Sequence, residues 1–273
     1  MTQSTVSADL YIHALADVYD TLKTPKDYEL WADLLEGVLG EHGCRGVRFL
    51  DVGCGTGSSS LVFQRRGFEV VGCDISAEML AVARRKDPAH DVPFLQADMR
   101  ELPASLSGFH VVHWMDDVAN HLLEADDLTA AVRSSAGALA PGGLLVFDVN
   151  TEATFGAHFA RGRQLVVERD DVVLIWRGRT ERPAPDSPAQ ALITVFRHRG
   201  EDLWTRESGA VVERHHSDAT VRRAITDGGL DVVGAYGLGG GPRSGTSLEP
   251  ADEAVHPKIL YVARRPGSAP VDA

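Results

Sequence analysis

Short apolar runs recur through the first half of the chain, and each one ends in polar residues. Helix-length segments separate them, and turn residues close two of these segments, at Gly67 and at 141–143. This alternation predicts an α/β fold with a doubly wound parallel sheet, in which the strands end together at one edge. The five predicted strands span residues 49–52, 68–73, 93–99, 109–114 and 144–150.

The flanks of this alternation follow other patterns. A helix is predicted to begin here, with Thr24 as its N-cap, Pro25 in its first turn and Asp27 at position N3. We expect it to end at Gly40 or Gly43. After residue 150 the alternation gives way to β-rich runs, which predict a small antiparallel sheet. Its predicted strands span 164–168, 172–177, 191–197 and 203–213.

The end of the chain returns to the first sheet. We expect the proline-rich loop 182–188 to be the mobile tip of the inserted sheet. A helix from Ser217 to Gly228 follows, and then an antiparallel pair formed by 230–236 and 258–264. Ordinary dinucleotide-binding folds lack this antiparallel pair, so its presence is evidence against a dinucleotide-binding protein.

The turn after the first strand carries the most informative motif. Gly53, Gly55 and Gly57 follow Asp51 at alternate positions, and glycine lets a backbone turn sharply and lie against a ligand. Gly-x-Gly turns also open dinucleotide folds, which more often continue to a glycine where Ser58 stands here. An adenosyl ligand is therefore favoured, and a nicotinamide dehydrogenase is the alternative.

Two further strands deliver carboxylates to the same edge. Asp74 ends the second strand, where an acceptor for the vicinal hydroxyls of a ribose is expected in a doubly wound sheet. Asp98 ends the third strand, where an adenine amino group could donate to it.

This succession, in register from Arg48 to Asn150, resembles the class I S-adenosylmethionine-dependent methyltransferases. The resemblance implies that S-adenosyl-L-methionine is the cofactor. It implies that the glycine turn packs against the methionine part, that the second-strand acid binds the ribose, and that the residues after the third strand contact adenine. The cofactor positions so implied are Asp51, Gly53, Cys54, Gly55, Gly57, Asp74, Ile75, Met79, Asp98, Met99 and Met115.

The N-terminal segment narrows the resemblance. Tyr19-Asp20 and Lys26-Asp27-Tyr28 are similar to the N-terminal lid of bacterial natural-product methyltransferases, including enzymes that dimethylate nucleotide-linked amino sugars. In such enzymes the lid folds over the cofactor, which would add Tyr19 and Tyr28 to the cofactor site. The alternative is that both tyrosines only pack an N-terminal helix pair. We hypothesise that residues Tyr11 to Tyr28 become ordered when the cofactor binds.

The resulting fold class is an α/β, Rossmann-like, doubly wound seven-stranded sheet with an N-terminal helical lid and a small antiparallel β insertion after strand five. The expected divisions are the lid at 1–45, the cofactor-binding core at 46–150, the acceptor-side insertion at 151–216, the end of the core at 217–266 and a disordered tail at 267–273.

The loop after the fourth strand is the expected acceptor side. His121 is the first candidate for a base or an acceptor-orienting group, with Asp116, Asp117 and Asn120 as neighbours. Solvent contact for the histidine and helix capping for the carboxylates are the alternatives. At most one of His215 and His216 could reach this site, because adjacent residues of a strand face opposite ways. Candidate catalytic residues are therefore His121, Asp116, Tyr19 and His216.

Composition limits the partners. The formal net charge is −12 and no basic stripe interrupts it, so nucleic acids and anionic membranes are not expected to bind. The first residues lack the features of a secretory signal, and the three cysteines form no metal or disulfide pattern, so we expect a cytoplasmic protein with reduced thiols. No recurring His or Cys spacing indicates a metal.

Together these features predict a methyltransferase that acts on an amine or a hydroxyl of a small molecule, such as a bacterial secondary metabolite or a sugar nucleotide. The alternative is a protein of the same fold that binds the cofactor without methyl transfer, as a cyclase or a regulatory module. The small-molecule acceptor is the expected partner, and a homodimer is left open.

Overall fold

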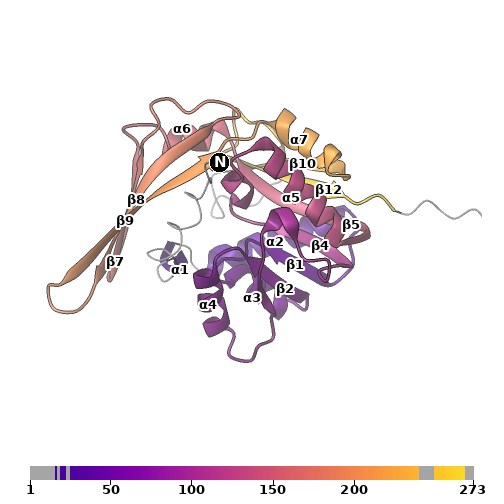
Figure 1. Ribbon diagram of the computed structural model, residues 1–273, viewed down its shortest axis with the longest axis horizontal. Helices are drawn as coiled ribbons and strands as arrows, with labels where there is room; N and C mark the ends of the chain where they lie inside the picture. Colours follow the sequence, from indigo (N-terminus) through magenta and orange to yellow (C-terminus); the bar gives the residue numbers. More distant parts are fainter. Residues whose placement is uncertain (1–15, 17–18, 23–24, 240–248, 268–273) are drawn as a thin grey trace, which may run out of the picture.

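A computed structural model describes residues 16, 19–22, 25–239 and 249–267 of the chain, and these form two β-sheets (Figure 1). The larger sheet has eight strands in the order β11-β10-β12-β5-β4-β1-β2-β3. Its strands are β1 (Arg48–Val52), β2 (Glu69–Asp74), β3 (Phe94–Gln96), β4 (Phe109–Trp114), β5 (Leu139–Asn150), β10 (Asp231–Leu238), β11 (Glu249–Pro250) and β12 (Lys258–Arg264).

The strand directions confirm the predicted fold class. Strands β1 to β5 pair in parallel, and β12 lies antiparallel between β5 and β10. The sheet exceeds the expected seven strands because the two-residue β11 pairs with Tyr236 and Gly237 at the edge. All five parallel strands therefore direct their carboxyl ends to the same side, where ligands bind in sheets of this type.

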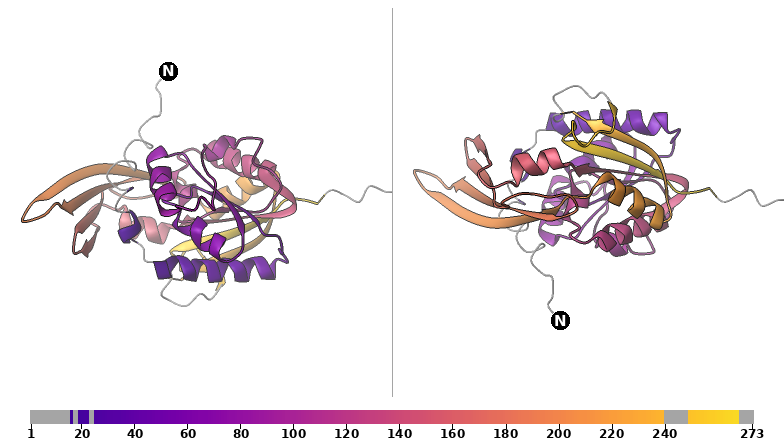
Figure 2. Two further views of the ribbon diagram at one scale, coloured as in Figure 1. Left: turned by 90° about the horizontal axis from the view of Figure 1, so that it is seen from below. Right: turned by 90° about the horizontal axis from the view of Figure 1, so that it is seen from above.

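Helices cover both faces of this sheet (Figure 2). Helices α2 (Pro25–Glu41), α3 (Ser58–Arg65) and α4 (Ala77–Lys86) pack on one face, and α5 (Ala125–Ala138) and α7 (Asp218–Asp227) pack on the other. Alternate strand residues serve the two sides: Phe49 packs with the first group and Leu50 with the second. Burial on both faces explains why these strands read as continuous apolar runs.

One helix boundary differs from expectation, and one expected cap cannot be compared. Pro141, Gly142 and Gly143 were expected to end a helix, but α5 ends at Ala138 and the three residues lie within β5. The backbone N–H of Gly142 donates to the carbonyl of Arg265 at 3.0 Å, which keeps this stretch in the sheet. The expected cap residue Thr24 lies outside the described residues.

The inserted sheet is antiparallel, as predicted, and projects away from the larger sheet (Figure 1). Its strands, in spatial order, are β6 (Gln164–Arg169), β7 (Val172–Gly178), β8 (Pro188–His198) and β9 (Trp204–Arg214). The helix α6 (Glu152–His158) links it to β5.

The proline-rich loop 182–188 was wrongly expected at the tip of this sheet. It lies at the base, because the carboxylate of Asp186 accepts the N–H of Ser217 at 2.9 Å and its hydroxyl at 2.8 Å. The N–H of His215 also donates to the carbonyl of Ser187 at 3.1 Å. The far ends of the sheet are the turns 170–171 and 199–203 instead.

Among the described residues, no helix is both long enough and apolar enough to cross a membrane.

Close backbone contact joins β7 to the segment that follows α6, at Gly178. A Cβ added there would lie 2.1 Å from the carbonyl oxygen of Ala160, a backbone atom. We predict that Gly178→Ala lowers the free energy of unfolding by about 1–3 kcal/mol, the usual cost of overpacking. Gly156→Ala is the control, because a Cβ at this helical position meets nothing within 4 Å. Urea unfolding measures both, and equal stability of the two variants would contradict this account.

Candidate functional site

The glycine turn between β1 and α3 has the predicted backbone geometry. Gly53, Gly55 and Gly57 have φ angles of 69°, 53° and 75°. Residues other than glycine rarely adopt this region of backbone conformation. A Cβ on Gly57 would meet Ala83 and the Phe94 ring at 2.8 Å, whereas a Cβ on Gly55 would meet nothing within 4 Å. Packing therefore requires a glycine at position 57, whereas Gly55 faces open space.

Asp74 at the end of β2 holds this turn in place. One carboxylate oxygen accepts the N–H of Gly55 and the other accepts the N–H of Ser76, each at 2.8 Å. Burial raises the pKa of Asp74, and these two backbone donors oppose that rise. Next to it the apolar side chain of Ile75 is exposed, at 51% of its surface.

Asp51 lies behind the turn and does not line it, contrary to the expectation. It is 1% exposed, and one carboxylate oxygen accepts the hydroxyls of Ser59 and Ser60 at 2.6 Å. The ring nitrogen Nδ1 of His113 lies 3.6 Å from its other oxygen. Asp51 therefore attaches the first turn of α3 to β1.

The other expected cofactor residues are mostly engaged within the protein. The side chains of Cys54, Met79 and Met115 are buried. Asp98 accepts the guanidinium of Arg100 at 2.6 Å, and this contact lowers the pKa of Asp98. Met99 packs against the core on the α5 side.

The short helix α1 (Tyr19–Leu22) lies against the glycine turn through polar contacts. One carboxylate oxygen of Asp20 accepts the hydroxyl of Thr56 at 2.6 Å and that of Ser58 at 3.1 Å, and the other accepts the ammonium of Lys86 at 2.7 Å. Tyr19 packs against the cluster around Met79. Tyr11 lies outside the described residues, so the ordering of the segment up to Tyr28 stays a prediction.

Tyr28, the other tyrosine expected at the cofactor, lies in the first turn of α2. Its side chain is 8% exposed, and its hydroxyl is hydrogen-bonded to Ser58. Burial is the largest cause that raises the pKa of Tyr28 above its ordinary value. The phenol is therefore neutral and fixed beside the first turn of α3.

The loop after β4 has a strained backbone, which is stabilised by hydrogen bonds to a carboxylate and by an ion pair. Asp116 and Asp117 adopt positive φ angles of 69° and 58°. Their N–H groups donate to the two carboxylate oxygens of Asp148 at the end of β5, at 2.6 Å and 3.1 Å. The ammonium of Lys258 from β12 bonds to Asp117 at 2.6 Å and to Asp148 at 2.7 Å.

Lys258 is the cation of this group. Burial alone would lower its pKa, but the negative charges of Asp117 and Asp148 outweigh burial and raise it. Asp116 also lies 3.7 Å from the ammonium. Lys258 therefore stays charged and neutralises part of the acidic loop.

The inserted sheet adds a fourth carboxyl group. Glu213 near the end of β9 is 2% exposed, and one of its oxygens accepts the side-chain N–H of Asn150 at 3.1 Å. Burial and the charge of Asp117 raise the pKa of Glu213 well above its ordinary value. Asn120 supports the same junction, because it accepts the N–H of Asn150 at 2.9 Å and donates to the carbonyl of Arg214 at 2.8 Å.

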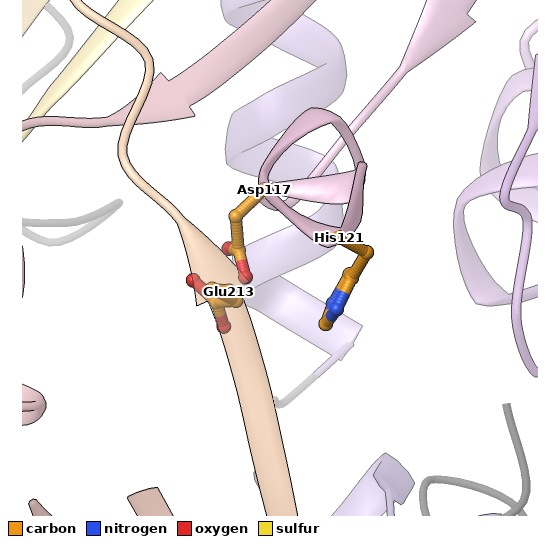
Figure 3. A group of neighbouring side chains, drawn as sticks. All are labelled: Asp117, His121 and Glu213. Atoms are coloured by element: carbon orange, nitrogen blue, oxygen red, sulfur yellow. The ribbon is translucent and has the colours of Figure 1, made fainter. Parts of the chain in front are cut away.

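Figure 3 shows the carboxylates of Asp117 and Glu213 side by side, with the ring of His121 extending toward the same region. The short helix η2 (Val118–His121) carries the histidine, and one polar atom from each of the three side chains lies within 4.8 Å of the others. Such donors are also found around metals. Here the cation beside Asp117 is Lys258, so we assign no metal to them.

The pKa of His121 is lowered by burial, against the opposing charge of Asp117. The imidazole is therefore neutral near pH 7 and can accept a proton. Gly53 brings this loop against the glycine turn, because a Cβ there would lie 2.7 Å from the Val118 side chain. The two parts of the site are thus in direct contact.

His216 does not reach this group, contrary to the expectation that it might serve as a base. It is 0% exposed, and its Nε2 hydrogen-bonds to the carbonyl of Leu122 at 3.0 Å. Burial lowers its pKa to about 4. His215 is buried as well, with its ring edge-on to Phe155. Both histidines therefore pack the junction where β9 leads into α7.

The chain is similar to several known proteins. Residues 49–143 match the family model described as a methyltransferase domain. The chain is 34% identical over 163 residues to protein YqeM of Bacillus subtilis, covering 59% of this chain and 64% of that protein. It is 31% identical over 140 residues to the dTDP-3-amino-3,6-dideoxy-α-D-glucopyranose N,N-dimethyltransferase of Streptomyces fradiae, covering 50% and 54%. The matches thus span about half to two thirds of these relatives.

A solved structure resembles the chain over nearly its whole length. The S-adenosylmethionine-dependent methyltransferase of Clostridium acetobutylicum superposes with a TM-score of 0.77 and 20% identity, covering 93% of this chain and 98% of that one. At this identity the likeness establishes the fold.

Removing the charge of Lys258 tests the electrostatic account of the loop. We predict that Lys258→Met lowers the free energy of unfolding at pH 7 by about 3 kcal/mol, because it leaves buried carboxylates unpaired. Their repulsion would raise the carboxyl pKa values of the folded variant above those of the unfolded chain. Protonation then stabilises the fold at low pH, so the loss shrinks from pH 7 to roughly pH 4–5.

The control is Lys26→Met, at an exposed position of α2. Urea unfolding of both variants at the two pH values provides the comparison. A deficit in Lys258→Met that does not change with pH would show that the ammonium acts by packing and not by charge.

Proposed function

We propose that residues 49–143 form an S-adenosylmethionine-dependent methyltransferase domain, and that the chain transfers a methyl group from this cofactor to an amine of a small molecule. The observation that carries the proposal is the excess of carboxyl groups beside the glycine turn. Four of them, Asp116, Asp117, Asp148 and Glu213, surround the single ammonium of Lys258.

The cofactor is S-adenosylmethionine, and we assign its binding to the turn at Gly55 and to Asp74. The two oxygens of the Asp74 carboxylate accept backbone N–H groups of Gly55 and Ser76, and a carboxylate has about four lone-pair sites, so it can also accept ribose hydroxyls. The space beside Gly55 lets a ligand approach the backbone closely. The exposed Ile75 offers an apolar surface for the adenine ring.

The charge balance of the reaction favours an amine over a hydroxyl. In methyl transfer the nitrogen lone pair attacks the methyl carbon, the N–C bond forms and the C–S bond breaks. S-adenosylhomocysteine leaves uncharged, and the positive charge moves from sulfur to the new ammonium. Carboxylates close to that nitrogen stabilise the charge as it develops. A hydroxyl acceptor would have to lose a proton and would gain less from them.

Positioning provides most of the rate enhancement in such a displacement. Holding the nucleophile in line with the methyl group can contribute roughly 7–11 kcal/mol. We propose that Asp117 orients the acceptor nitrogen and that His121 accepts its proton. The amino-sugar nucleotide in the name of the Streptomyces fradiae relative is the first acceptor to test.

The cofactor site is tested by Asp74→Ala. The loss of a charged acceptor for two ribose hydroxyls, each bond worth about 1.5–3 kcal/mol, should weaken S-adenosylmethionine binding by at least tenfold. Asp171→Ala, at an exposed turn of the inserted sheet, is the control and should bind as the wild type does. Calorimetry measures both affinities. Unchanged affinity in a folded Asp74→Ala protein would move the ribose site elsewhere.

The activity is tested with dTDP-3-amino-3,6-dideoxy-α-D-glucopyranose and its 3-hydroxy counterpart. We predict that the wild type forms S-adenosylhomocysteine and an N-methylated sugar from the amine only, because only that acceptor becomes an ammonium. Mass spectrometry identifies the product. Methylation of the hydroxyl compound alone would overturn the assignment to nitrogen. Cofactor binding without turnover on a wider panel of amines would favour a binding protein.

A further inference from the structure

A cavity of about 330 Å³ lies at the base of the inserted sheet, where the loop 181–184 passes α6. Binding sites for small molecules begin at roughly this size. A Cβ added to Gly156 of α6 would meet nothing within 4 Å, so the helix leaves open space on this side. The lining combines apolar residues with three polar side chains: Phe155, Gly156 and Pro183 with Glu152, Arg182 and His215.

The cavity and the acidic loop lie on different sides of α6. The hydroxyl of Thr154 donates to the carbonyl of Pro257 at 2.6 Å, directly before Lys258. On a helix with 3.6 residues per turn, residues 152 and 156 point away from residue 154. These two, Glu152 and Gly156, line the cavity. The cavity is therefore separate from the proposed methyl-transfer site.

His215 contributes a buried hydrogen-bond donor to the lining. Its Nδ1 accepts the backbone N–H of Asp186 at 3.3 Å, so the neutral ring carries its hydrogen on Nε2. Burial lowers the pKa of His215 against the opposing charges of Glu152 and Asp186, which keeps the ring neutral at pH 7. Among the described residues, Nε2 is buried and has no hydrogen-bond partner. Such a donor costs free energy, which an acceptor oxygen would recover.

Two opposite charges complete the lining. Glu152 and Arg182 are both exposed, and within the part of the chain that the structure describes neither side chain forms an ion pair or a hydrogen bond. The other charged lining residue, Glu181, is already paired with Arg161 at 2.9 Å. The cavity thus offers one carboxylate and one guanidinium, each without an internal partner.

We propose that this cavity binds a small zwitterion of the α-amino acid class. The carboxylate of the ligand accepts hydrogen bonds from the guanidinium of Arg182 and the Nε2–H of His215. Its ammonium group donates to Glu152, and its apolar side chain packs on Phe155. An anion alone would be repelled by Glu152, and a cation alone by Arg182. This inference goes beyond the proposed methyl transfer and involves neither the cofactor nor a methyl acceptor.

The test is an NMR titration of the isotope-labelled full chain with L-leucine. Two matched probes each lack one charge: 4-methylpentanoate has no ammonium group, and 3-methylbutylamine has no carboxylate. We expect leucine to bind about fivefold more tightly than either probe, the upper range of what a solvent-exposed ion pair contributes. Equal affinity for the three molecules, or no binding of leucine at millimolar concentrations, would overturn the proposal.

Variants of the lining locate the ligand. Arg182→Gln should bind leucine about fivefold more weakly without weakening 3-methylbutylamine, and Glu152→Gln should do so without weakening 4-methylpentanoate. Gly156→Leu should abolish binding, because its side chain fills the cavity. Arg206→Gln and Glu207→Gln, at exposed positions of β9, are the controls and should bind leucine as the wild type does. Unchanged leucine affinity in both charge variants of the cavity would contradict the assignment.

Urea unfolding shows whether Gly156→Leu is folded. If it is not, the two charge variants decide the question, because they replace exposed side chains and should fold as the wild type does. The titration uses no methyl acceptor. A failure of leucine to bind would therefore count only against this site, and an absence of methyl transfer only against the proposed function.

Discussion

The contact of Lys258 with Asp148 and Asp117 is the interaction on which the site depends. Two consecutive aspartates after β4 adopt a left-handed backbone that costs energy, and their N–H groups bind the carboxylate of Asp148. Without a cation this carboxylate and that of Asp117 would repel each other. The ammonium of Lys258 bonds to both, and the loop can then turn sharply against Gly53.

This loop joins two parts of the molecule that have different tasks. The core sheet supplies the glycine turn and Asp74, which suit an adenosyl group. The inserted sheet supplies Glu213, and its base is fixed by Asp186 and by the close approach at Gly178. Because the two parts meet at Asn150 and Asn120, a change in the docking of the insertion would alter the acidic group directly.

The local patterns of the sequence were sufficient to predict the fold. Apolar runs, turn glycines and the β-rich segment after residue 150 each act over a few residues, and they predicted the two sheets and the glycine turn. The pairing of β10 with β12 was also readable from two β-rich runs near the chain end. The extra strand β11 was missed because a two-residue strand has no periodicity to detect.

The site was less predictable, because its charges meet across long distances in the chain. Asp117 and Lys258 are 141 residues apart, and Glu213 and Asn150 are 63 apart, so no spacing pattern links them. In the sequence, these side chains were marked only by their positions: Lys258 begins one expected strand and Glu213 ends another. Asp51 was expected to contact the cofactor because it precedes the glycines. Its carboxylate instead accepts hydrogen bonds from the hydroxyls of Ser59 and Ser60. His216 was misjudged because the strand ends before it, so alternation did not apply.

A crystal structure with S-adenosylhomocysteine bound tests the central claim most directly, namely that the glycine turn and the acidic loop form one methyl-transfer site. The account predicts that the ribose hydroxyls contact Asp74 and that the sulfur lies beside the glycine turn, facing Asp117 and His121. A ligand bound at Asp74 with its sulfur directed away from the β4 loop would contradict it.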